Sequence, residues 1–273
     1  MSARRAAMEA SRRLAAAGIE DARFEAELLA REAAGVSRAA YFAGSALDAA
    51  EAERFAEWVE RRTQREPAAY ITGHREFYGR DFGVGAGVLI PRPETELLVE
   101  LALSEIDRDP GAVVVEAGTG SGAVAVSIAA ERPGARVVAT EISPGAMRFA
   151  KANAAAHAPG VGLVLGDLLS IVSRADVVLA NLPYIPSWEI EALEPEVSRW
   201  EPRVALDGGK DGYELISRLI EDCAARLRPR LLALEVGYGQ AGDVEALVMR
   251  HGAEPWTVRD LAGIDRIVCG RWA

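Results

Sequence analysis

The sequence predicts an α/β protein in which a small helical bundle precedes a doubly wound, mostly parallel sheet. Three observations predict this class. The chain of 273 residues is long enough for one large α/β domain and a helical appendage. Helical patterns without a strand pattern run from Arg4 to about Arg65, and beyond residue 110 short apolar runs alternate with helical patterns.

The helical part carries start and stop signals. Gly35 follows an Ala-, Leu- and Glu-rich segment, in the place where a glycine takes the left-handed conformation that ends a helix. Asp48 followed by Glu51 resembles a capping box, and Pro67 ends the helix that follows it. We therefore expect an N-terminal helical domain over residues 1–67.

Short extended pieces replace the helical pattern over residues 68–90. Phe77–Tyr78 and Asp81–Val84 are separated by a Gly-Arg pair, which predicts a hairpin-like linker. The two prolines of Leu89–Glu96 then fix the backbone, and its acidic residues enter the first turn of a helix. A second domain should therefore span residues 91–273.

The second domain repeats strand patterns that are apolar on both faces, as interior parallel strands are. These runs are Val113–Val115, Val137–Ala139, Leu163–Leu165, Val177–Leu179 and Leu231–Leu234. Helical patterns separate most of them; one starts at Ser143-Pro144, with serine as the N-cap. Two last strands near residues 257 and 267 are joined by a short turn-rich segment, which predicts an antiparallel pair at one edge of the sheet.

Composition excludes several classes of function. Asp and Glu exceed Lys and Arg by 41 − 31 = 10, so the chain should not attract a nucleic-acid backbone or an anionic membrane. No uncharged apolar run approaches the ~20 residues that span a bilayer. Cys223 and Cys269 are too few for a disulfide framework, and the three histidines lack metal-ligand or triad spacing. We expect no metal and a cytoplasmic location.

A glycine-rich loop follows the first strand of the second domain. Gly118, Gly120 and Gly122 let the backbone turn sharply and approach a ligand, and the next helix offers free N–H groups at its start. The loop predicts a nucleotide-type cofactor site. The same spacing also satisfies a relaxed dinucleotide fingerprint, so a nicotinamide-dependent oxidoreductase remains open at this point.

Two acidic strand ends add to this site. Glu141 lies about 20 residues beyond the loop, where a carboxylate accepts hydrogen bonds from ribose hydroxyls. Asp167, after the third strand, lies where an adenine ring would be. The candidate cofactor-binding residues are Glu116, Gly118, Thr119, Gly120, Ser121, Gly122, Glu141, Ile142, Asp167, Leu168 and Asn181.

Asn181-Leu182-Pro183-Tyr184 directly follows the fourth strand and supplies the candidate catalytic and substrate-binding residues. A planar NH₂ group has a delocalised lone pair, so methylation requires that the amine be held by two acceptors. The Asn181 side-chain oxygen can be one of them. The Leu182 carbonyl can be the other, because a residue before proline is held in an extended conformation. Tyr184 would pack on the planar group.

Together, the glycine loop, the acidic strand end and Asn-x-Pro-Tyr resemble class I S-adenosylmethionine-dependent methyltransferases that act on nitrogen. Four longer strings are similar to those of the PrmC/HemK family. They are Ala69-Tyr70-Ile71-Thr72-Gly73, Arg75-Glu76-Phe77-Tyr78-Gly79, Leu89-Ile90-Pro91-Arg92-Pro93-Glu94-Thr95-Glu96 and Glu201-Pro202-Arg203-Val204-Ala205-Leu206-Asp207-Gly208-Gly209. The resemblance covers nearly the whole chain.

The resemblance implies a Rossmann-like, mostly parallel seven-stranded sheet with an antiparallel edge strand. It also implies methyl transfer from S-adenosyl-L-methionine to the glutamine amide of the Gly-Gly-Gln motif in peptide chain release factors, with S-adenosyl-L-homocysteine as product. The helical domain would recognise this protein substrate, and the enzyme would be a monomer without direct nucleic-acid binding. Two positions depart from the family: Leu182 replaces the usual proline, and Glu116-Ala117 replaces the more frequent Asp-Leu.

Two further functions remain open from the residues. Asn-Leu-Pro-Tyr also occurs in enzymes that resemble ribosomal RNA adenine dimethyltransferases, so an N6-adenine methyltransferase is the main alternative; the net charge of −10 argues against it. A non-catalytic protein that binds the cofactor is the other, and only Leu182 supports it.

Overall fold

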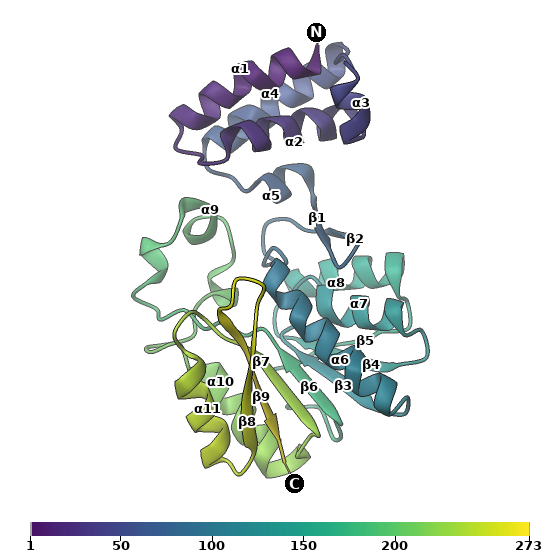
Figure 1. Ribbon diagram of the computed structural model, residues 1–273, viewed down its shortest axis with the longest axis vertical. Coiled ribbons are helices and arrows are strands. Elements are labelled where there is room, and N and C mark those ends of the chain that lie inside the picture. The colour runs from purple at the N-terminus through teal and green to yellow at the C-terminus, as the bar shows by residue number, and fades with distance from the viewer. Residues whose placement is uncertain (1, 273) are drawn as a thin grey trace. The chain divides into compact units, whose positions relative to one another are not determined.

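A computed structural model describes residues 2–272, which form two compact units (Figure 1). The first contains the chain up to His74 together with Glu194–Trp200, and the second contains Arg75–Leu193 together with the chain from Glu201 onward. The predicted domain boundaries at residues 67 and 90 stay a prediction.

The first unit is a helical bundle, as the sequence predicts. Its helices are α1 (Ala3–Ala16), α2 (Ala22–Ala34), α3 (Arg38–Phe42), α4 (Ala49–Thr63), α5 (Ala68–Thr72) and α9 (Pro195–Ser198). Gly35 ends α2 in the left-handed conformation with φ 62°. The predicted capping box begins α4: Glu51 N–H donates to the Asp48 carboxylate at 2.8 Å, and Asp48 N–H donates to Glu51 Oε2 at 2.8 Å. Helix α5 was not expected.

The predicted hairpin is formed by β1 (His74–Phe77) and β2 (Arg80–Gly83), and all of it except His74 belongs to the second unit. The turn residues are Tyr78 and Gly79, one position before the predicted Gly-Arg pair, and both have positive φ, as the tightest hairpin turns require. The helices that follow are η1 (Pro93–Thr95), α6 (Glu96–Arg108), α7 (Ala123–Glu131), α8 (Pro144–His157), η2 (Ile190–Ala192), η3 (Arg203–Ala205), α10 (Glu214–Asp222), the π-helical η4 (Cys223–Leu227) and α11 (Ala241–Arg250).

A seven-stranded sheet forms the centre of the second unit, in the order β5-β4-β3-β6-β7-β9-β8. Its strands are β3 (Val113–Ala117), β4 (Arg136–Glu141), β5 (Gly162–Leu165), β6 (Val177–Ala180), β7 (Leu231–Glu235), β8 (Glu254–Arg259) and β9 (Asp265–Arg271). Strands β3 to β7 pair in parallel, and β9 runs antiparallel to both β7 and β8. The predicted sheet is thus confirmed, with the antiparallel strand one place in from the edge.

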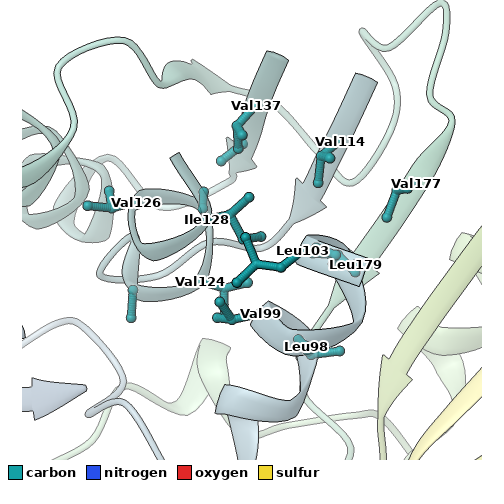
Figure 2. Packing of buried hydrophobic residues seen from close by; sticks show 14 of the residues in the cluster. Leu98, Val99, Leu103, Val114, Val124, Val126, Ile128, Val137, Val177 and Leu179 are labelled. Carbon is teal, nitrogen blue, oxygen red and sulfur yellow. The ribbon is translucent and has the colours of Figure 1, made fainter. Parts of the chain in front are cut away.

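Two apolar cores cover the two faces of this sheet. Helices α6, α7 and α8 lie on one face and α10 and α11 on the other (Figure 1). Side chains alternate along each strand: Val114 and Leu179 belong to the first core, which Figure 2 shows around Leu103, whereas Val115 and Val178 belong to the second. Both faces of β3, β4, β6 and β7 are therefore buried, which explains their continuous apolar runs. The edge strand β5 was predicted as an interior strand from its apolar run, but Val164 and Leu165 are exposed. None of the helices between residues 2 and 272 combines the length and apolarity needed to cross a membrane.

Candidate active site

A cavity of about 540 Å³ opens at the carboxyl ends of β3, β4 and β6, and all its lining residues belong to the second unit. This edge of an open parallel sheet is where ligands bind in doubly wound folds. Its volume is in the range of small-molecule sites. The predicted residues on its wall are Glu116, Gly118, Thr119, Gly120, Ser121, Glu141, Ile142, Asp167, Leu168, Asn181, Leu182 and Pro183.

The glycine loop has the backbone that its sequence predicts. Gly118 and Gly120 have φ of 74° and 57°, and the N–H groups of Gly118 and Thr119 both donate to the Thr140 carbonyl at 3.0 Å. Gly122 is not part of the cavity wall. A Cβ there would lie 3.2 Å from Ala150 Cα, so Gly122 permits close packing of α7 against α8.

Glu116 is a buried carboxylate at the base of this loop. Its Oε2 accepts hydrogen bonds from Thr119 Oγ1 at 2.5 Å and from Ala125 N–H at 3.0 Å. Burial raises the pKa of Glu116 to about 7, the negative charge of Glu141 adds to the rise, and the two hydrogen bonds oppose it. A cation bound in the cavity would favour the charged form of this carboxylate.

Glu141 ends β4 and joins it to the glycine loop. Its Oε2 accepts from Gly120 N–H and its Oε1 from Ser143 N–H, each at 2.8 Å. Each carboxylate oxygen keeps a second lone pair, so the side chain can still accept from two ribose hydroxyls. The bend of the glycine loop and the fixed Glu141 therefore fit an adenosine-containing cofactor.

Apolar and polar side chains line the cavity just beyond the carboxyl ends of β4 and β5. Ile142 and Leu168 both line the cavity, and Ile142 is 58% exposed. Asp167 Oδ2 accepts from Arg218 Nη2 at 2.6 Å. Arg218 also lines the cavity; the sequence analysis missed it because it lies on α10, 51 residues beyond Asp167.

Asn181, Leu182 and Pro183 lie on the cavity wall directly after β6. Within residues 2–272, the Asn181 side chain makes one hydrogen bond: its Nδ2 donates to Thr95 Oγ1 at 3.1 Å. Tyr184 does not line the cavity: it packs on the core under α10 and α11, and its carbonyl accepts from Gln240 Nε2 at 2.9 Å. Its predicted stacking on the substrate stays a prediction.

Residues of the Leu89–Glu96 and Glu201–Gly209 strings also line the cavity. Arg92 and Thr95 belong to the proline-rich string Leu89–Glu96, and residues 202–205 and Asp207 belong to the string Glu201–Gly209. Arg92 Nη2 donates to both oxygens of the buried Glu201, at 2.7 and 2.8 Å, and so joins the two strings. The quoted strings were the only signal for these positions.

The doubly wound sheet and this cavity, with a glycine loop after β3, an acidic end of β4 and Asn-Leu-Pro-Tyr after β6, define a class I S-adenosylmethionine-dependent methyltransferase. A methyltransferase from Pyrococcus furiosus has the same fold, with a TM-score of 0.53 and 19% identity over 71% of this chain and 89% of that chain. Residues 5–73 match the PrmC N-terminal domain model, and residues 93–192 match the methyltransferase small domain model.

Two curated relatives align along nearly the whole chain. The release factor glutamine methyltransferase of Geobacter sulfurreducens is 41% identical over 94% of this chain and 92% of its own length. That of Moorella thermoacetica is 42% identical over 97% of each chain. The chain belongs to the release factor glutamine methyltransferase family.

Proposed function

We propose that this enzyme methylates the side-chain amide nitrogen of the glutamine in the Gly-Gly-Gln motif of peptide chain release factors. The observation that carries the proposal is that Asn181 and Leu182 lie on the wall of the cavity that the glycine loop also lines. Membership of the family favours the amide substrate over the adenine that the tetrapeptide alone left open.

The amide nitrogen is a weak nucleophile because its lone pair is delocalised into the carbonyl group. Asn181 Oδ1 and the Leu182 carbonyl would accept its two N–H bonds and aim the nitrogen at the methyl group. Both oxygens also stabilise the positive charge that develops on nitrogen during attack. S-adenosyl-L-methionine, when bound, supplies a methyl group activated by its sulfonium charge. As the new N–C bond forms, the broken S–C bond leaves its electron pair on sulfur, and the methylated nitrogen releases one of its two protons to water. Orientation by the two acceptors therefore replaces a strong general base.

The cofactor would be held by the residues predicted for it. Glu141 would accept from the ribose hydroxyls, Ile142 and Leu168 would pack on the adenine, and Gly118 and Gly120 would allow close backbone approach. The buried Glu116 would balance the positive charge of the bound cofactor.

The remaining predictions extend this proposal. The helical domain over residues 1–67 and the linker over residues 68–90 would bind the body of the release factor, and residues 91–273 would carry out methyl transfer. We further propose that the enzyme acts as a monomer in the cytoplasm and does not bind nucleic acid directly. The net charge of −10 supports the last point.

Mass spectrometry tests the reaction and its site. Purified enzyme, S-adenosyl-L-methionine and a release factor should give a gain of one methyl group on the Gly-Gly-Gln glutamine. Asn181→Ala should lower the rate by about 100-fold or more, because one of the two acceptors is lost. Its affinity for S-adenosyl-L-homocysteine should fall by much less, because Glu141 and the glycine loop still hold the cofactor. Equal methylation of a release factor whose target glutamine is replaced would falsify the proposal.

A further inference from the structure

Asn181 is the half-buried end of a hydrogen-bonded network of three polar side chains, whose other two members, Thr95 and Glu235, are buried. Thr95 Oγ1 donates to Glu235 Oε2 at 2.6 Å, and Asn181 Nδ2 donates to Thr95 Oγ1 at 3.1 Å. Thr95 and Glu235 are 5% and 3% exposed, so solvent does not compete for these groups. Such buried networks fix the orientation of their members when every donor meets an acceptor.

The fold brings the three side chains together from separate strings. Asn181 directly follows β6 and Glu235 ends β7; because Ala180 pairs with Leu234 in the parallel register, the next residues lie side by side. Thr95 ends η1 and comes from the proline-rich string before α6. All three belong to the second unit.

The donors and acceptors of this network fix the direction of each hydrogen bond when Glu235 is ionised. An ionised carboxylate only accepts, so the single hydroxyl proton of Thr95 must point to Glu235. The Thr95 oxygen can then only accept, and Asn181 must turn its NH₂ group towards it. Asn181 Oδ1 consequently faces away from Thr95 and accepts no hydrogen bond from the described residues.

We propose that Thr95 and Glu235 are positioning residues that hold the Asn181 carboxamide with its oxygen towards the methyl acceptor. The inference rests on the proposed role of Asn181 and adds what selects one of the two amide orientations. A reversed carboxamide would present NH₂ to the NH₂ group of the substrate and could not accept from it.

The protonation state of Glu235 should decide the direction of these hydrogen bonds. Burial raises the pKa of Glu235 to about 7, against the hydrogen bond from Thr95. The charged or titratable groups that face Glu235 are Glu94, Arg92 and Arg266, and the neighbouring Tyr184. When Glu235 is protonated, it can donate to Thr95, whose own proton then points to Asn181. The Asn181 carboxamide must reverse to accept this proton with Oδ1, and its NH₂ group then faces the substrate.

The first experiment compares Thr95→Val, which keeps the shape but removes the hydroxyl group, with Thr95→Ser, which keeps the hydroxyl group. Thr95→Val should lower kcat on a release factor about tenfold, the effect of one lost orienting hydrogen bond. Thr95→Ser should restore kcat to within about twofold of the parent enzyme. Affinity for S-adenosyl-L-homocysteine, measured by calorimetry, should change in neither variant. Equal losses in both variants, or an unchanged kcat in Thr95→Val, would overturn the proposal.

A pH profile at saturating cofactor supplies a second readout, which holds even if Thr95→Val does not fold. The kcat of the parent enzyme should rise between about pH 6 and about pH 8 as Glu235 ionises. Glu235→Gln should lower kcat and flatten this rise, because its amide has no proton to lose. A rise that persists in Glu235→Gln would contradict the positioning role.

The two proposals can fail separately. If Asn181→Ala keeps full activity, the proposed function of Asn181 is wrong. If Asn181→Ala is inactive and Thr95→Val is fully active, only the positioning role is wrong.

Discussion

At the residue scale, we expect the ionisation of the buried Glu116 carboxyl to affect cofactor binding. Its pKa of about 7 means that a large fraction is neutral near neutral pH. The product S-adenosyl-L-homocysteine carries an ammonium group, which interacts favourably only with the ionised carboxylate. Since this acid loses its proton as the pH rises, the affinity for the product should increase about tenfold between about pH 6 and about pH 8.

Calorimetric titrations at several pH values measure this effect. Glu116→Gln should bind more weakly at the upper pH and show little dependence on pH. Glu105→Gln is the matched control, because Glu105 is also a buried carboxylate but lies on α6 outside the cavity wall. A pH dependence that persists in Glu116→Gln, or disappears in Glu105→Gln, would assign the titration to another group.

At this scale the sequence predicted residues whose roles depend on local geometry. Gly118, Gly120 and Glu141 have the conformations and partners that a strand-loop-helix segment requires. Pairs distant in sequence were not predicted. Thr95 and Asn181 are 86 residues apart, and no periodicity or spacing brings two such positions together.

At the scale of elements, the backbone over residues 201–212 packs directly against the backbone of Asn-Leu-Pro-Tyr. A Cβ on Gly212 would lie 2.3 Å from the Tyr184 carbonyl oxygen, and one on Gly208 would lie 2.7 Å from the Pro183 carbonyl oxygen. Gly212 also has φ +85°, which side chains rarely adopt. Only glycine therefore allows this close approach of two backbones.

Gly212→Ala should displace the tetrapeptide and lower kcat more than about tenfold, with a loss of stability of about 1–3 kcal/mol from backbone strain. Gly242→Ala is the matched control. Gly242 lies in α11 with nothing within 4 Å of a Cβ, so alanine should stabilise the helix by about 0.5–1 kcal/mol and leave kcat unchanged. Thermal unfolding measures the stability of both variants, and initial rates measure their kcat. Equal stability and equal kcat in the two variants would show that Gly212 does not position the tetrapeptide.

The strands and helices also show which sequence patterns are sufficient to predict an element. The five parallel strands were predicted from continuous apolar runs, which burial on both faces explains in β3, β4, β6 and β7. The edge strand β5 has such a run although Val164 and Leu165 are exposed. The N-caps Asp48 and Ser143 were predicted because capping depends on residues three apart. Short elements such as α5 and η1 lack a full apolar period, and tertiary packing decides their conformation.

At the scale of the whole molecule, one segment of the sequence beyond β6 belongs to the first unit. Residues Glu194–Trp200 belong to the helical unit, although the sequence analysis placed them in the second domain. Arg62 of α4 pairs with Glu25 of α2 and, at 2.7 Å, with Glu196 of α9. Arg65 also donates to Glu196, at 2.7 Å. Arg65 and Glu196 are 131 positions apart in the sequence, so no local pattern predicts this contact.

Arg62 should therefore hold α2, α4 and α9 in one unit. Its side chain is only 4% exposed, so replacing it with alanine leaves two carboxylates without their buried partner and should cost about 3 kcal/mol. Arg13→Ala is the control: the Arg13–Glu60 pair is 52% and 60% exposed and should contribute about 1 kcal/mol or less. Hydrogen exchange of the α4 amides measures the effect within this unit alone. Protection of α4 should fall by about 100-fold in Arg62→Ala and by less than about tenfold in Arg13→Ala, and equal protection in both would show that the buried cluster does not stabilise the unit.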